Sequence, residues 1–193
     1  SRCYQHESVP FKALDGLADA IGEYLQDTPE EERARLLPDG LQDLARLFPA
    51  LRMIPRIEVK VSDAADSQLD PHEQRRRGFQ ALRALFHRLA EGRQVVITLD
   101  DLQWGDEDSL AALTEVLAPP NAPPVLVVAC GRTEDGGVQV LERMAQVFSA
   151  ASIAVDALEI GPLSSAETAE LAGSLLTGDI TPTAALDAAL SGL

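Results

Sequence analysis

The feature that most constrains this sequence is a short apolar run that ends in two adjacent carboxylates. Val95 to Leu99 is almost wholly apolar and β-branched, and Asp100 and Asp101 follow it directly. Such a run predicts a strand buried on both faces, as in a parallel sheet covered by helices. Carboxylates at the end of a buried strand are costly unless a cation or a donor compensates them. In open α/β sheets ligands bind at the carboxyl ends of strands, so this pair is the first candidate for a functional site.

Two interpretations of the carboxylate pair remain open at this point. Adjacent residues of a strand point to opposite sides, so one carboxylate can hold a hydrated Mg²⁺ while the other faces an attacking water. Alternatively, the pair only begins a turn before the helix that Asp106 caps.

The second half of the chain alternates between predicted strands and helices. Helices are expected at about 106–117 and 138–150, and another begins at Ser164 or Ser165 with Glu167 placed for a capping box. The apolar runs 95–99, 125–130 and about 152–160 are predicted to be neighbouring parallel strands, because a helical crossover links each to the next. The first half shows helical periodicity at about 11–25, 30–37, 41–48 and 72–91, with a polar surface loop over 62–71.

The segment Asp100-Asp101-Leu102-Gln103-Trp104-Gly105-Asp106 resembles the Walker B motif of STAND-type AAA-like ATPases. These are P-loop ATPase domains of large bacterial signalling regulators, fused to LuxR-type DNA-binding, adenylate cyclase or serine/threonine kinase domains. Three further stretches resemble the same family in the same order: Ser1 to Phe11, Val125 to Arg132, and Leu158 to Ser164.

The resemblance implies an α/β, P-loop NTPase-like parallel sheet flanked by helices, with a helical insertion before the Walker B strand. Residues 1–163 would form an incomplete ATPase core, and 164–193 the start of a helical lid. Asp100 would coordinate Mg²⁺, Asp101 would orient or activate the attacking water, and Arg132 would sense or neutralise the γ-phosphate of ATP. Metal, carboxylate and cation are the parts that phosphoryl transfer needs, because its catalysis is mainly positioning and charge neutralisation.

The sequence departs from the family pattern in one respect. It contains no Gly-x-x-x-x-Gly-Lys-Ser/Thr phosphate-binding loop. The family places this loop just before the segment that matches Arg2-Cys3-Tyr4, which predicts a chain truncated after the loop and lacking the first strand. Such a fragment should bind ATP poorly, whereas the parent would use ATP binding and slow hydrolysis as a conformational switch.

Charge and apolar patterning exclude some partners. The net charge of −15 argues against direct binding of a nucleic-acid backbone. No run approaches the ~20 apolar residues of a membrane span, so a cytoplasmic protein is expected, with effector domains and possible self-association as partners. Cys3 and Cys130 are predicted to be reduced, buried thiols.

The residues also allow other interpretations. A degenerate, non-hydrolysing scaffold is the main alternative, although it would not need Asp100, Asp101 and Arg132. A phosphohydrolase independent of a P-loop would need a lysine near the carboxylates, and Lys12 and Lys60, the only two, are poorly placed. The run 75–77 of three arginines suggests either an anion site or, more simply, a solvated helix face paired with acidic neighbours.

Overall fold

The computed structural model describes residues 11–54, 70–132 and 137–175. The elements in chain order are α1 (Lys12–Asp27), α2 (Glu30–Leu36), α3 (Leu41–Leu47), the 3₁₀ helix η1 (Pro49–Met53), α4 (Pro71–Leu89), β1 (Val95–Leu99), the 3₁₀ helix η3 (Leu102–Trp104), α5 (Glu107–Leu117), β2 (Val125–Ala129), α6 (Gly137–Ala150) and α7 (Ser165–Leu175). The predicted helices are confirmed, with ends that differ by a few residues. Most of the predicted loop at 62–71 and the N-terminal family segment at 1–10 lie outside the described residues.

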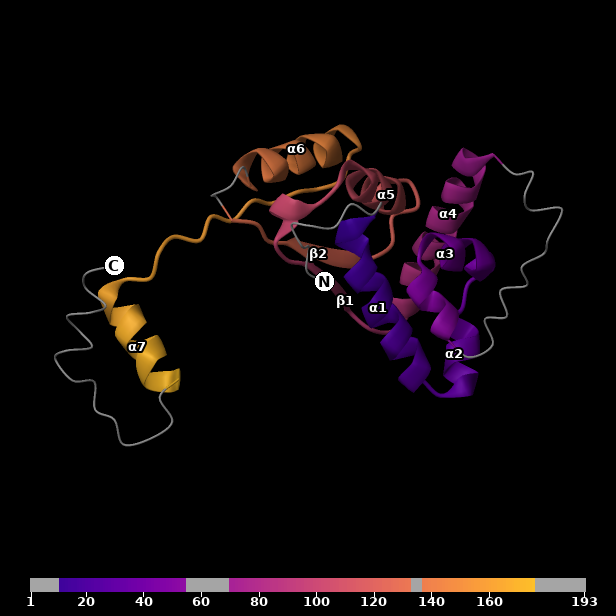
Figure 1. The fold of residues 1–193 in the computed structure, drawn as a ribbon, viewed down its shortest axis with the longest axis horizontal. Coiled ribbons are helices and arrows are strands. Elements are labelled where there is room, and N and C mark those ends of the chain that lie inside the picture. Colours follow the sequence, from indigo (N-terminus) through magenta and orange to yellow (C-terminus); the bar gives the residue numbers. More distant parts are fainter. Residues whose placement is uncertain (1–10, 55–69, 133–136, 176–193) are drawn as a thin grey trace. The chain divides into compact units, whose positions relative to one another are not determined.

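Two parallel strands form the sheet at the centre of the fold (Figure 1). Their register pairs Val95 with Val125 and Leu99 with Ala129, so both strands end at the same edge. Helix α5 connects them, as a parallel crossover requires. The fold is therefore α/β with a parallel sheet flanked by helices, consistent with a P-loop NTPase-like fold.

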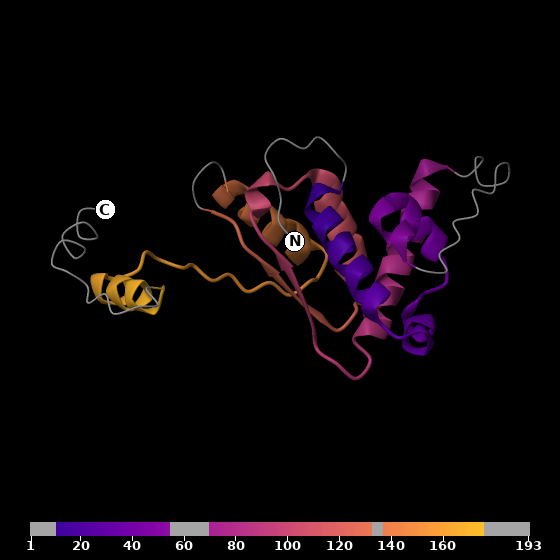
Figure 2. The same cartoon turned by 60° about the horizontal axis from the view of Figure 1, so that its bottom comes forward.

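The core joins one face of this sheet to the helices. Ile97 and Leu99 are buried on that face, and α1 packs on β1 while α5 packs between α4 and α6. Residues of α1 and α6, such as Leu14 and Phe148, belong to the same core as Ile97 and Leu99, and Figure 2 shows both helices beside the strands. The other face differs from the prediction of burial on both sides. Val96 is 55% exposed and Leu126 60% exposed there, because none of the described elements covers them.

The predicted strand over 152–160 is wrong. The structure assigns no strand to these residues, and Leu158 and Ile160 are each 86% exposed. Their apolar spacing suits a strand, but a strand also needs a neighbour whose backbone groups complete its ladder, and no described strand pairs with this segment. Only Ile153 packs against the core, where its amide donates to the Phe148 carbonyl at 2.9 Å.

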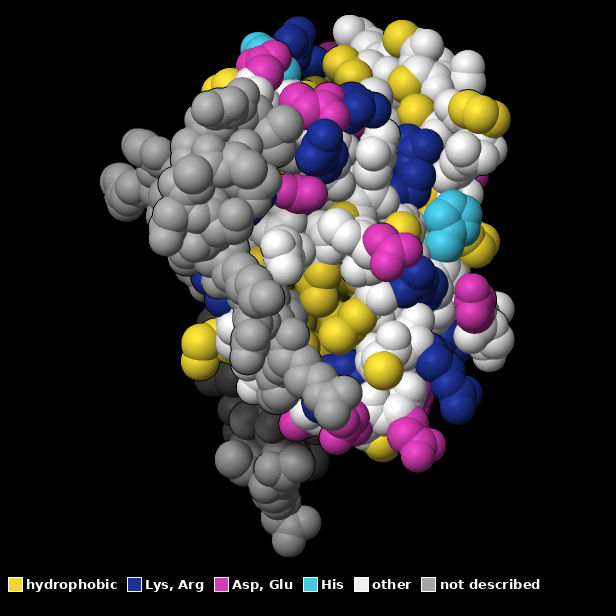
Figure 3. Space-filling view, turned by 90° about the vertical axis from the view of Figure 1, so that its right-hand side faces the viewer, with side chains coloured by type: hydrophobic (Ala, Val, Ile, Leu, Met, Phe, Trp, Pro, Cys, Tyr) yellow, Lys and Arg dark blue, Asp and Glu magenta, His cyan; other side chains and the backbone are white. Residues whose placement is uncertain are grey.

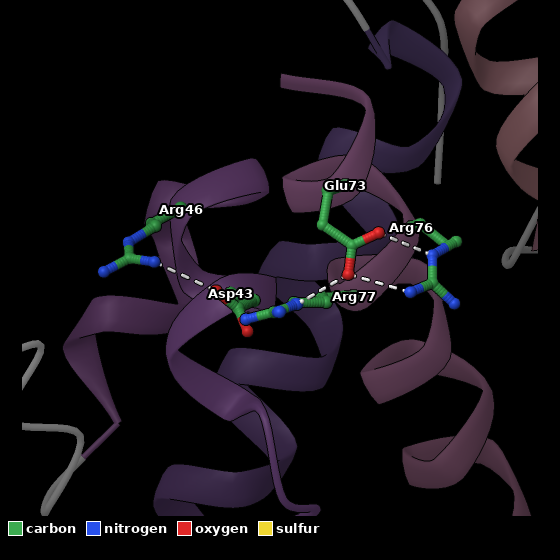
Figure 4. Close-up of polar contacts among 5 residues, drawn as sticks. All are labelled: Asp43, Arg46, Glu73, Arg76 and Arg77. Carbon is green, nitrogen blue, oxygen red and sulfur yellow. Dashed lines mark hydrogen bonds and ion pairs between the residues drawn. The ribbon is translucent and has the colours of Figure 1, made fainter. Parts of the chain in front are cut away.

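The arginine run of α4 is a solvated helix face with acidic partners. Lys/Arg and Asp/Glu side chains are interspersed on the side of the molecule seen in Figure 3. The Glu73 carboxylate accepts hydrogen bonds from Arg76 at 2.8 Å and Arg77 at 3.0 Å, close to the pair of Arg46 and Asp43 (Figure 4). These hydrogen bonds lower the pKa of Glu73 to about 2. The simpler interpretation, a solvated helix face with acidic partners, is therefore favoured, because Glu73 pairs with both Arg76 and Arg77 and Asp108 pairs with Arg75.

Residues Asp156–Leu193 form a second compact unit, distinct from Ser1–Val155. Within it, the predicted capping box of α7 is confirmed: the Ser164 amide donates to Glu167 Oε2 at 2.8 Å, and the Glu167 amide donates to Ser164 Oγ at 3.3 Å. Residues 176–193 of the predicted lid lie outside the described residues. The assignment of 1–163 to a core and 164–193 to a lid stays a prediction. None of the described helices is long and apolar enough to cross a membrane.

Candidate functional site

The carboxyl ends of β1 and β2 are joined beyond the last strand residues. The Cys130 amide donates to the Leu99 carbonyl at 2.8 Å, and the Leu102 amide donates to the Cys130 carbonyl at 2.9 Å. The two loops that leave the sheet therefore start side by side. Cys130 itself is an exposed free thiol, so its predicted burial is wrong, because its side chain follows the exposed face of β2. Cys3 lies outside the described residues.

The two carboxylates at the end of β1 lie in different environments. Asp100 is exposed, and its Oδ1 accepts a hydrogen bond from the Asp101 amide at 3.0 Å. Asp101 is buried and adopts the left-handed backbone region at φ 54° and ψ 40°. This conformation is uncommon outside glycine, asparagine and aspartate, and it turns the chain sharply away from the strand. The two adjacent carboxylates therefore differ in exposure, Asp100 facing solvent and Asp101 lying buried.

Arg132 reaches the same place from the end of β2. Its Nε lies 3.6 Å from Asp101 Oδ1, and its side chain is 64% exposed whereas that of Asp101 is 12% exposed. The structure thus brings together all three predicted site residues at one edge of the sheet. A cation beside a buried carboxylate, with a second carboxylate on the solvent side, can bind an anionic group and a metal ion together.

Gln103 is a site residue that the sequence analysis did not single out. Its side chain is buried, and its Nε2 donates to Asp101 Oδ1 at 3.2 Å. Its Oε1 accepts from the Arg132 backbone amide, also at 3.2 Å. The signal that could have identified it is an amide between the apolar residues Leu102 and Trp104, since an amide that becomes buried must find partners for both its donor and its acceptor.

A second polar cluster fixes the helices behind the site. Asp106 caps α5, as predicted, by accepting from the Ser109 amide at 2.8 Å, and the same Oδ1 accepts from the Phe11 amide at 3.2 Å. Ser109 Oγ donates to Asp106 Oδ2 at 2.5 Å and accepts from the Ala13 amide at 3.1 Å. Burial alone would raise the pKa of Asp106, but hydrogen bonds from Ser109, Phe11 and Lys12 outweigh it and lower the pKa. The cluster ties the start of α1 to the start of α5.

The start of α1 is itself strained. Phe11 adopts a left-handed conformation at φ 65°, which is rare for a bulky residue. Its ring packs against Phe48 and Phe79 at centroid distances of 5.7 and 5.6 Å, and the Arg75 guanidinium lies 5.8 Å from its centroid. Together with the bond to Asp106, these contacts over-determine the conformation of Phe11.

A small apolar pocket of about 100 Å³ lies among α1, α5 and α6. Leu102, Leu110 and Met144 contribute to its lining, and the ion pair of Arg143 with Glu107 lies at its rim. Neither carboxylate of the Asp pair lines it, nor does Arg132. Arg143, the cation in its lining, is already paired with Glu107 at 2.8 Å, so we place the candidate site at the sheet edge instead.

The donor chemistry at the sheet edge suits Mg²⁺ held by few protein ligands. In the described part of the chain, no group of three or more His, Cys, Asp or Glu side chains could hold a metal ion. Mg²⁺ commonly binds through one or two carboxylates, with waters and substrate phosphates as its other ligands. The exposed carboxylate of Asp100 fits this mode.

A comparison with protein families agrees with the geometry. The family described as "AAA ATPase domain" matches residues 1–128, about two thirds of the chain. The match includes the Asp pair and Gln103 but ends before Arg132, so the place of Arg132 in the site rests on its contacts. No curated protein and no solved structure matches the chain. The chain belongs to the AAA ATPase domain family, a family of P-loop ATPases.

Proposed function

We propose that this chain supplies the metal-binding and hydrolytic edge of an ATPase module that works as a conformational switch. The observation that carries the proposal is the convergence of Asp100, Asp101 and Arg132 at the carboxyl ends of two parallel strands. A switch of this kind needs ATP binding and slow hydrolysis rather than fast turnover, because the nucleotide state itself is the signal.

Each residue has the surroundings that its proposed role requires. Asp101 is shielded from solvent and can orient an attacking water or accept its proton. Arg132 is exposed enough to move from Asp101 to a γ-phosphate, whose charge it would neutralise. Asp100, on the solvent side, would hold Mg²⁺, which neutralises charge on the phosphates when it is bound.

The phosphate-binding loop and its lysine would come from sequence outside these 193 residues, which contain no Gly-x-x-x-x-Gly-Lys-Ser/Thr. We therefore expect no saturable binding of Mg-ATP to this chain alone at millimolar concentration, and binding only in the complete protein.

The segment 100–106 resembles the STAND-type Walker B motif, and this resemblance supports a cytoplasmic signalling regulator. Its effector domains would bind DNA, make cyclic AMP or phosphorylate proteins, and it could self-associate. The net charge of −15 supports contact with proteins rather than direct contact with nucleic acid.

Two isosteric substitutions in the complete protein test the site. Asp101→Asn should keep Mg-ATP binding and slow single-turnover hydrolysis by ~10²–10⁴-fold, since an amide cannot accept the proton. Asp100→Asn should weaken Mg²⁺-dependent binding, because it removes charge from the shell of the metal. Glu107→Gln, at the exposed ion pair with Arg143, is the matched control and should change neither quantity.

The outcomes separate the alternatives. Equal hydrolysis by wild type and Asp101→Asn would remove the catalytic role of Asp101 and favour a non-hydrolysing scaffold for protein–protein contact. Loss of binding in the Asp101 variant, with hydrolysis spared in the Asp100 variant, would reverse the two roles.

A further inference from the structure

Gln103 connects two of the proposed site residues through opposite ends of one amide group. Its Nε2 donates to Asp101 Oδ1 and its Oε1 accepts from the Arg132 amide, both at 3.2 Å. Only 8% of the residue is exposed, so water cannot readily replace either bond.

The bond to Arg132 continues the pattern of hydrogen bonds between the two strands. The Cys130 amide donates to the Leu99 carbonyl, and the Leu102 amide donates to the Cys130 carbonyl. The next amide in this series belongs to Arg132, and the side-chain carbonyl of Gln103 accepts from it in place of a backbone group. The link between the strands thus extends past the sheet to the residue that carries the cation.

The surroundings fix the Gln103 side chain in place. A Cβ atom added at Gly137, the first residue of α6, would lie 1.8 Å from the Arg132 carbonyl oxygen and 3.3 Å from Gln103 Cβ. This close approach of the α6 backbone closes the space beside Gln103. A packed side chain with two directed bonds determines the distance between its partners more closely than the single 3.6 Å ion pair does.

We propose that Gln103 is a positioning residue for the hydrolytic step, which holds the Asp101 carboxylate at a set place relative to Arg132. The inference rests on the proposed function, because it assigns Asp101 to the water and Arg132 to the phosphate. The glutamine amide offers a donor to the carboxylate and an acceptor to the amide at once. Glutamate keeps the acceptor and loses the donor, and methionine keeps the volume and loses both.

The test compares Gln103→Glu and Gln103→Met with wild type in the complete protein. Hydrogen exchange resolved to single amides reports the bond to Arg132, and the Cys130 amide, bonded to a backbone carbonyl, is the internal control. Single-turnover hydrolysis and equilibrium binding of Mg-ATP report the site. Gln103→Met should speed hydrogen exchange at the Arg132 amide but not at the Cys130 amide. It should slow hydrolysis on the order of 10–10²-fold, while the affinity for Mg-ATP stays within ~3-fold of wild type. Gln103→Glu should protect the Arg132 amide and still slow hydrolysis.

These readouts separate this inference from the proposed function. Unchanged exchange at Arg132 in Gln103→Met, or hydrolysis at the wild-type rate in both variants, would overturn the positioning role. A role confined to packing predicts normal hydrolysis in Gln103→Met, which preserves volume. If wild type bound Mg-ATP without hydrolysing it, the proposed function would fail, and with it the role of Gln103 in hydrolysis. The exchange data would still decide whether Gln103 accepts a hydrogen bond from the Arg132 amide.

Discussion

Asp106 stabilises two helix starts with one carboxylate. It accepts from the Ser109 amide in α5 and from the Phe11 amide at the start of α1, and it also accepts from the Ser109 hydroxyl. Replacing it with alanine removes a helix cap and leaves the Phe11 amide without this acceptor. We expect Asp106→Ala to lower the free energy of unfolding by ~1–2 kcal/mol. Denaturant unfolding measures the change, with Glu107→Ala in the same turn as a control of smaller effect, because that change removes only an exposed ion pair with Arg143.

The loss caused by Asp106→Ala should depend on pH. The folded protein lowers the pKa of Asp106 below its ordinary value of 3.8. A lowered pKa means that the stabilisation is complete above the ordinary value and is lost as pH falls through the folded value. The difference between variant and wild type should therefore be full at neutral pH and shrink in strong acid. A difference that stayed constant across this range would show that the charge of Asp106 contributes nothing.

The candidate site could be predicted only in part from its residues. Asp100, Asp101 and Arg132 were predictable because parallel strands place their carboxyl ends at one edge, whatever the loops do. Gln103 was not, because its contact with Asp101 depends on the left-handed turn at Asp101 and on the approach of α6. Neither is encoded in residue type or spacing alone.

At the scale of elements, α3 and α4 cross where α4 lacks a side chain. A Cβ added at Gly78 would lie 2.3 Å from Leu47 Cδ1, 2.9 Å from Leu47 Cγ and 3.3 Å from the Asp43 carbonyl oxygen. Alanine in a helix interior is normally better than glycine by ~1 kcal/mol. At Gly78 the overpacking should outweigh this gain and cost ~1–3 kcal/mol, since the neighbouring backbone must also shift.

Thermal or denaturant unfolding of Gly78→Ala measures this cost. Gly22→Ala in α1 is the matched control, because its nearest contact would be the Ala50 carbonyl oxygen at an ordinary 3.8 Å. That variant should be neutral or more stable. A stabilised Gly78→Ala protein would show that α3 and α4 do not meet as closely as described.

Helices were easier to predict than strands for a physical reason. The hydrogen bonds of a helix lie within its own segment, so the apolar stripe and caps of α1 or α5 suffice. A strand depends on a partner that is distant in sequence. The run 125–130 finds β1, whereas the run 152–160 has a similar apolar pattern and finds no described partner. Apolar content also failed to show which face of the sheet is covered, because the residues at Val96 and Leu126 do not differ in type from those on the buried face.

At the scale of the whole molecule, the acidic excess should make stability depend on salt. The chain carries 31 acidic and 16 basic residues, so repulsion opposes the compact state. Raising ionic strength from 0.01 to 0.15 M shortens the screening length from ~30 to ~8 Å. We expect the unfolding midpoint to rise on the order of 2–4 °C, equivalent to ~1 kcal/mol at this chain length.

The control for this effect reverses two exposed charges of α1. Asp19→Lys together with Glu23→Lys should reduce the dependence on salt, because both positions are exposed and the changes lower the acidic excess. A midpoint that fell with salt in wild type would mean that ion pairs such as those of Glu73 outweigh the overall repulsion.

The left-handed backbone at Asp101 also limits which substitutions position 101 can accept during evolution. Asparagine tolerates that conformation and glycine adopts it freely, whereas most other residues add strain there. One base substitution in an aspartate codon produces either of these two residues. If Asp101 serves hydrolysis as proposed, this activity can be lost by a single mutation that leaves the fold intact, while most other substitutions at position 101 carry a cost in stability. In lineages where the module has become a pure scaffold, we expect asparagine or glycine at position 101 more often than alanine or valine, which are also one base away.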